Sequence, residues 1–247
     1  MKHPKTHKSA GFTILEVMIA TAILSTVLLV ASFVIVAIGR LYTKGTTGAS
    51  LQNNVRNIVQ TLSDGVQYAT ASSQMQSGSR TDTFHGLAVK LNSVCAGNVE
   101  ITYAADIIPN VNLGSTPYSM PYTIWQSQTP GSGCQPIPID SYTSSTPQNA
   151  TSQNIGLPNE AIHSLTLSPT GAGSQVSSGA KGVTLWQISI AAYSAAGNDL
   201  VNGAGNPYSV PAVNPGTTVS CKGASGQEFC FTSSLTTVAV QRFSPVP

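Results

Sequence analysis

Charged residues are scarce in this chain of 247 residues, where Asp, Glu, Lys and Arg together make up only 8%. Soluble globular domains typically carry about 25%. Three of the 11 basic residues, Lys2, Lys5 and Lys8, lie within the first ten, which leaves 8 basic against 9 acidic residues in the remainder. The bulk of the chain is therefore close to neutral. A chain so close to neutral makes no strong electrostatic case for nucleic acid, so the sequence offers no support for a nucleic-acid partner.

Motifs that carry chemistry are missing as well. Only two histidines follow the first ten residues, His85 and His163, and neither has a carboxylate or cysteine at the spacing of a metal site or a catalytic triad. We interpret each as a hydrogen-bonded histidine within a strand. The acidic residues are scattered, with no alternating run of calcium ligands. The sequence therefore predicts no catalytic residue, no cofactor and no metal.

The four cysteines, Cys95, Cys134, Cys221 and Cys230, allow three disulfide pairings. Their spacings contain no Cys-x-x-Cys, and no pair of histidines lies near them, which disfavours a zinc site. In an exported protein they are disulfide candidates. We expect Cys95–Cys134 and Cys221–Cys230, because each of these bonds closes a loop that is local in the sequence.

A run without charged residues or proline extends over residues 17–39. A helix needs roughly 20 such residues to cross the hydrocarbon core of a bilayer. The four hydroxyl residues within the run do not forbid insertion, because each can bond back to a carbonyl one turn earlier. The lysines that precede the run keep its amino-terminal side in the cytoplasm. We therefore expect a single-pass membrane protein whose carboxy-terminal domain lies outside.

The residues directly before this run are Gly11-Phe12-Thr13-Ile14-Leu15-Glu16. A glycine, a phenylalanine and a glutamate at this spacing, after a lysine-containing leader and flush against an apolar helix, resemble the signal of type IV pilins and of type II secretion pseudopilins. The resemblance covers residues 8–71 and is weak beyond them. It implies cleavage by a prepilin peptidase between Gly11 and Phe12 and methylation of the new amino group of Phe12.

The same resemblance implies a role for Glu16 and a set of partners. In such filaments the corresponding carboxylate pairs with the terminal amine of a neighbouring subunit during assembly. The implied partners are the prepilin peptidase, other pilin or pseudopilin subunits, an inner-membrane assembly platform and membrane lipid. The implied location is the cytoplasmic membrane first, and then a cell-surface or periplasmic filament.

These observations divide the chain into four parts: a leader (1–11), a transmembrane and filament-core helix (12–40), an amphipathic continuation of that helix (41–71) and an exported β-rich domain (72–247). Gly39, Gly45 and Gly48 mark the place where we expect the helix to bend or locally melt, because glycine weakens a helix by about 1 kcal/mol. Apolar residues then recur at helical spacing and predict one face packed on a sheet. They are Leu51, Val55, Ile58, Val59, Leu62 and Val66.

Beyond the helix the hydrophobic period changes from 3.6 to 2. Residues 72–82, rich in Ser, Gln and Gly, predict a loop. Strands are predicted at 84–91, 99–103, 122–126, 164–167, 183–193 and 236–242. Long polar spacers separate them. A helix followed by short strands predicts an α+β fold, with an antiparallel sheet packed on the long amino-terminal helix and with disulfides.

The favoured function is a structural subunit of a type IV pilus-like or type II secretion-like filament, and not an enzyme. Residues 49–56 are similar to the corresponding helix of large W-type minor pilins and of the J-type minor pseudopilin. The large, loop-rich domain also favours a minor over a major subunit. The alternative is an uncleaved, membrane-tethered surface binding domain that does not assemble. Glu16 discriminates between them, since only a filament subunit needs its charge.

Overall fold

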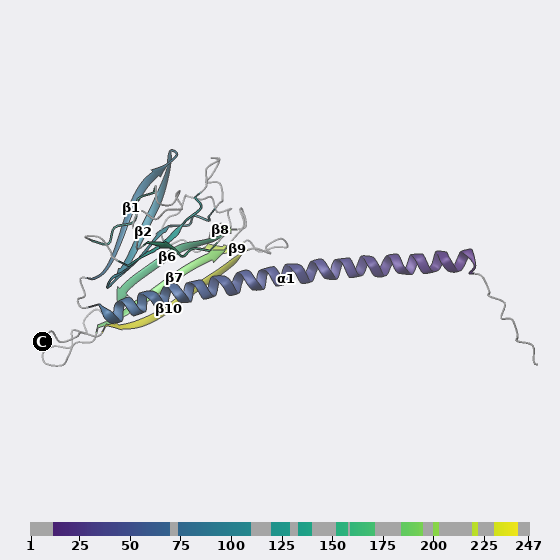
Figure 1. The fold of residues 1–247 in the computed structure, drawn as a ribbon, viewed down its shortest axis with the longest axis horizontal. Helices are drawn as coiled ribbons and strands as arrows, with labels where there is room; N and C mark the ends of the chain where they lie inside the picture. Colours follow the sequence, from purple (N-terminus) through teal and green to yellow (C-terminus); the bar gives the residue numbers. More distant parts are fainter. Residues whose placement is uncertain are drawn as a thin grey trace, which may run out of the picture. The chain divides into compact units, whose positions relative to one another are not determined.

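The computed structural model describes residues 12–69, 74–109, 120–128, 133–139, 152–157, 159–170, 184–194, 200–202, 219–221 and 230–241. The chain falls into two units, Met1–Thr43 and Lys44–Pro247. One helix and several antiparallel strands make up the described parts, which confirms the predicted α+β class. Figure 1 shows these elements along the chain.

Helix α1 runs without interruption from Ile14 to Tyr68. The expectation of local melting at the glycines is therefore wrong. About 1 kcal/mol per glycine is too little to break a helix that continues for several turns on both sides. Gly48 even serves packing, because a side chain there would come within 3.0 Å of the ring of Phe231.

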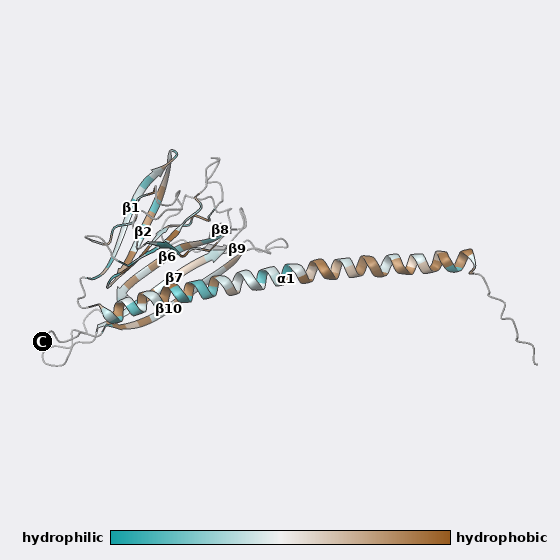
Figure 2. Cartoon of the chain, in the orientation of Figure 1, coloured by the Kyte–Doolittle hydropathy of each residue, from teal (hydrophilic) through white to brown (hydrophobic). Residues whose placement is uncertain are grey.

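The first unit presents apolar side chains to the outside all round. Figure 2 shows this part of α1 as predominantly hydrophobic, and it is long and apolar enough to span a membrane. Its hydroxyl groups are satisfied within the helix, as the sequence predicted. Each donates to a carbonyl oxygen one turn back: Thr21 to Met18 at 3.0 Å, Ser25 to Thr21 at 2.7 Å, Thr26 to Ile23 at 2.8 Å and Ser32 to Leu28 at 2.8 Å.

The second unit contains three antiparallel sheets among its described residues. The first has the order β1-β2-β3-β4-β5, the second the order β10-β7-β6, and the third pairs β8 with β9. Their bounds are β1 Met75–Phe84, β2 Leu87–Ala96, β3 Val99–Ala104, β4 Ile124–Ser127, β5 Gln153–Asn154, β6 Glu160–Pro169, β7 Thr184–Ser194, β8 Leu200–Asn202, β9 Val219–Cys221 and β10 Phe231–Gln241.

The carboxy-terminal part of α1 packs on both larger sheets through the predicted apolar stripe. All six residues of that stripe are buried, and Leu62 and Val66 are completely inaccessible. They join inward-facing residues of both sheets in one core cluster, to which β7 contributes Trp186, Ile188 and Ile190. A second cluster lies around Trp125. The helix thus closes the domain on one side, as the periodicity predicted.

Strand β1 overturns the prediction of a loop over residues 72–82. Every residue from Met75 to Phe84 pairs with β2, but only these two end residues are buried. An exposed strand at the edge of a sheet needs no hydrophobic periodicity, so the sequence carried no signal for it. His85 and Gly86, with φ of 48° and 84°, form the two-residue turn to β2, so the placement of His85 in a strand is also wrong.

Other strand predictions are confirmed in place but not in extent. β6 begins four residues earlier than predicted, at Glu160, and β10 begins five residues earlier, at Phe231. The short strands β5, β8 and β9 lie in segments predicted as spacers. Two or three residues are too few for period-2 alternation to stand out.

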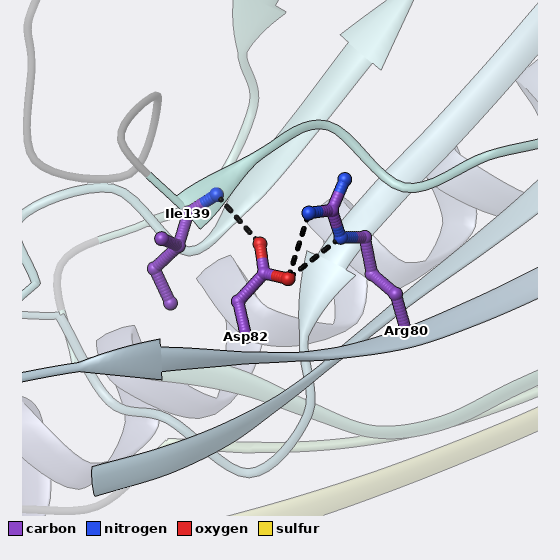
Figure 3. A network of polar contacts seen from close by, with 3 residues as sticks. All are labelled: Arg80, Asp82 and Ile139. Carbon is purple, nitrogen blue, oxygen red and sulfur yellow. Dashed lines mark hydrogen bonds and ion pairs between the residues drawn. The ribbon is translucent and has the colours of Figure 1, made fainter. Parts of the chain in front are cut away.

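The disulfide Cys95–Cys134 is present, as predicted. Cys230 is also disulfide-bonded, but the side chain of Cys221 lies outside the described residues, so the second pairing stays a prediction. Cys134 belongs to a segment, residues 133–139, that lies against β1. Figure 3 shows a second contact between this segment and β1. The Asp82 carboxylate accepts a hydrogen bond from the Ile139 backbone N–H at 3.2 Å and pairs with Arg80 at 2.8 Å.

Candidate functional site at the amino-terminal segment

The predicted processing site lies at the start of α1. Gly11 is outside the described residues, whereas Phe12 is 83% exposed. Thr13 precedes the first helical residue and is followed three residues later by Glu16. This Thr-x-x-Glu spacing is that of a capping box, and it is visible in the sequence although it was not predicted from it.

The hydrogen bonds around Thr13 and Glu16 have the reciprocal pattern of that motif. The Glu16 N–H donates to Thr13 Oγ1 at 3.3 Å, and the Thr13 N–H donates to Glu16 Oε2 at 3.4 Å. The Thr13 hydroxyl also contacts Glu16 Oε2 at 3.4 Å. All three contacts are long, so the carboxylate is held only loosely. Its negative charge near the helix start is favourable to the helix dipole.

Glu16 forms no salt bridge with any other residue that the structure describes. Its side chain is exposed, and apolar residues follow it for more than six turns. A carboxylate at the edge of such a run costs free energy when the run enters an apolar phase. An amine from another molecule would offset that cost, because an ion pair in a low-dielectric environment compensates both charges.

The amino-terminal segment was compared with models of known protein families. Residues 6–32 match the model of the prokaryotic N-terminal methylation motif. The chain carries a prepilin-type methylation motif. The matched residues include Gly11, Phe12 and Glu16 together with most of the apolar run, and the match supports a pilin or pseudopilin type of protein. No curated protein and no solved structure matches the chain.

A second group of polar residues, not predicted from the sequence, lies in the second unit. His163 Nδ1 is 2.8 Å from Asp106 Oδ1, and the two side chains are 12% and 2% exposed. The two residues are 57 positions apart, so no local sequence pattern predicts that they form a pair. The register of β6 shifts between Ile162 and Ser164, which makes His163 the extra residue of a β-bulge.

Two further carboxyl groups are buried. Burial raises the pKa of Glu160 to about 7, although the Leu157 N–H and the Asn54 side-chain amide donate to it and lower the pKa. Burial likewise raises the pKa of Glu100 to about 7, and the nearby Thr102 side chain opposes this rise only in part. Asn54 belongs to α1 and Glu160 to β6, so their contact of 2.6 Å ties the helix to a sheet.

Glu100 lies close to the sulfurs of Cys95 and Cys134, an arrangement that resembles a metal site in composition. The two sulfurs are bonded to each other, however. A disulfide has no thiolate to donate, so this group cannot hold a metal as zinc sites do.

Proposed function

We propose that this protein is a subunit of a type IV pilus-like or type II secretion-like filament, more specifically a minor pilin or minor pseudopilin. The observation that supports it best is the match of residues 6–32 to the methylation motif. In this proposal a prepilin peptidase cleaves between Gly11 and Phe12, the amino group of Phe12 is methylated, and an inner-membrane platform assembles the subunits. The large exported domain with long connections favours a minor subunit.

The exposed apolar surface of the first unit supports the same proposal. Residues such as Leu29, Phe33 and Ile35 are each at least 70% exposed. Apolar surface of this extent needs a partner, because water disfavours it by about 25 cal/mol per Å². Lipid provides that partner before assembly, and the helices of other subunits provide it in a filament. The subunit would therefore exchange one apolar environment for another.

The first experiment is mass spectrometry of the amino-terminal peptide of the mature protein. We expect a peptide that begins at Phe12 and carries one additional methyl group. A protein that retains Met1 in cells with an active prepilin peptidase would contradict the proposal.

The second candidate function, an unassembled membrane-tethered domain, draws support from the capping box, because it gives Glu16 a role that needs no second molecule. The substitution Glu16→Gln separates the two candidates. Glutamine also serves in a capping box, so this change keeps the cap and removes the charge. A filament subunit should then lose assembly while its membrane insertion is intact, whereas a tether should be unaffected.

Thr13→Ala is the matched control, because it removes the cap and retains the charge. Loss of an N-cap costs about 1 kcal/mol, which a helix of this length tolerates. We expect Thr13→Ala to assemble at a level far above that of Glu16→Gln. Equal assembly of Glu16→Gln and the unaltered protein into sheared filaments would refute an intersubunit ion pair.

A further inference from the structure

The exported domain contains a cavity of about 300 Å³ between β1, β2, β3 and β6. It begins where the side chains on one face of the five-stranded sheet, the face that packs on α1, change from apolar to polar. The row of Val94 and Ile101 is apolar and belongs to the core, whereas the next row pairs Ser79 with Asn92 and Asn92 with Tyr103. The cavity is lined by Ser77, Gly78, Ser79, Lys90, Asn92, Ser93, Tyr103, Ala105, Asp106, His163, Ser164, Leu165 and Thr166.

Two irregularities of the backbone meet at this cavity. His163 is the extra residue of the bulge in β6, and Asp106 has a φ of 61°, in the left-handed region. The Asp106 N–H donates to the Ile162 carbonyl at 3.0 Å, which fixes the two segments together. Conformations of this kind cost free energy and gather at functional sites. Here their result is to bring the imidazole of His163 and the carboxylate of Asp106 to the cavity wall.

The walls around this pair are held in place. The Leu165 N–H donates to the Tyr103 hydroxyl at 3.0 Å, which links β6 to β3. The Ala105 N–H donates to the Lys90 carbonyl at 2.9 Å. The hollow is thus part of a hydrogen-bonded framework, as expected of a preformed binding site.

Lys90 gives the cavity its charge. Its ammonium group forms no ion pair with any residue in the described part of the chain. The Asp106 carboxylate is buried and already contacts the His163 imidazole, with Asp106 Oδ1 2.8 Å from His163 Nδ1. A half-buried lysine without an ion-pair partner, in a cavity lined by several hydroxyl-bearing residues, favours an anion that also offers hydroxyl groups.

From this arrangement we infer that the cavity binds a carboxylated, hydroxylated ligand of the size of one sugar ring, such as a uronic acid. The carboxylate pairs with Lys90. The hydroxyl groups of the ligand exchange hydrogen bonds with Asn92 and with serines on β1 and β6. Free uronic acids and the terminal residues of acidic polysaccharides share this chemistry.

Other ligand classes fit less well. Phosphate groups are typically held by arginine, by several cations or by helix amino termini, and the lining offers a single lysine. Tyr103 is only 3% exposed, so it presents no open ring on which a neutral sugar could stack. The volume lies at the lower limit of ligand pockets, which excludes an extended ligand inside the cavity.

The test is isothermal titration calorimetry on the full chain in detergent micelles, with sodium glucuronate and sodium galacturonate as probes. Glucose, galactose and glucose 6-phosphate serve as comparison ligands. We expect saturable binding of one uronate per chain, with an affinity at least about tenfold higher than that of the neutral sugars. The neutral sugars lack the carboxylate that pairs with Lys90, and the loss of one partly buried ion pair lowers affinity by about this factor. A short oligogalacturonate then distinguishes a polysaccharide end from a free acid, because only a polysaccharide site would bind it at least as well.

Variants locate the site. Lys90→Met keeps the length of the side chain without its charge and should weaken uronate binding about tenfold or more. Lys90→Arg should retain most of the affinity. Arg56→Gln removes an exposed cation on α1 and is the matched control, with no expected effect. A thermal melt of each variant establishes that it is folded.

Three results would overturn the inference. The first is absence of saturable binding of both uronates to the folded, unaltered protein. The second is binding that Lys90→Met and Arg56→Gln weaken equally. The third is tighter binding of glucose, or of glucose 6-phosphate, than of the uronates, which would show that the site does not select a carboxylate.

Discussion

The two parts of α1 have the same secondary structure but different surroundings. In the first unit the large apolar side chains of the helix are exposed in this single chain, whereas from Leu51 onward the apolar stripe is buried by the protein's own sheets. The difference lies in the sequence pattern. The first part is apolar on every side, and the second alternates apolar and polar residues at the helical period.

This comparison shows that one continuous helix can depend on two separate sources of stability. Burial against both larger sheets stabilises the second part and belongs to the folding of the domain. Nothing within the described chain stabilises the first part by burial. Its apolar surface is exposed in the single chain, and the stability of the domain should be insensitive to changes there.

A matched pair of leucines tests this separation with the largest expected effect. Leu62→Ala should lower the free energy of unfolding of the domain by about 2–5 kcal/mol, because Leu62 is completely buried. Leu28→Ala should leave it unchanged, because Leu28 is 58% exposed. Denaturant unfolding, followed by tryptophan fluorescence, measures both. A loss above about 1 kcal/mol in Leu28→Ala would show that the two parts are not independent.

The contact between helix and sheet at Glu160 gives a smaller effect that depends on pH. The folded pKa of about 7 lies above the ordinary value of 4.5. The unfolded chain therefore loses its proton first, and the domain loses stability as pH rises from about 4.5 to about 7. Glu160→Gln mimics the protonated form and should stabilise the domain at pH 8 by on the order of 2 kcal/mol, with little change at pH 4.

Chemical unfolding at both pH values measures this effect. Asp64→Asn is the control, because Asp64 is an exposed carboxylate on the same helix. A stabilisation by Glu160→Gln of equal size at pH 4 and pH 8 would mean that the charge is not its source. Glu100, raised to about the same pKa by burial, should leave part of the pH dependence in place.

The smallest effect concerns the pair on β1 in Figure 3. Arg80 is 41% exposed, so Arg80→Ala should change the free energy of unfolding by less than about 0.5 kcal/mol. Asp82→Ala should cost more, about 1–2 kcal/mol, because it also leaves the Ile139 N–H without its acceptor. Equal losses in thermal or denaturant unfolding would show that the Ile139 contact contributes nothing.

Sequence reasoning succeeded where the pattern was local and repeated. The stripe from Leu51 to Val66 and the stronger strand β7 were predictable, because burial on one side imposes a period that the residues record. Strand β1 was not predictable, because an exposed edge strand is held by backbone hydrogen bonds to β2, to which any polar residue contributes equally. The prediction of local melting at the glycines of α1 failed for a related reason. The small free-energy cost of each glycine is outweighed by the helix that continues on both sides.

The sequence by itself determined the methylation motif, the membrane-length apolar run and the amphipathic continuation of the helix, because each is encoded within one short stretch. Only the tertiary structure decided which distant polar groups meet. His163 and Asp106, Asn54 and Glu160, and Lys90 at its cavity are brought together by strand order, by a bulge and by the docking of the helix. Those placements depend on packing between segments far apart in the chain, and no local pattern of residues records them.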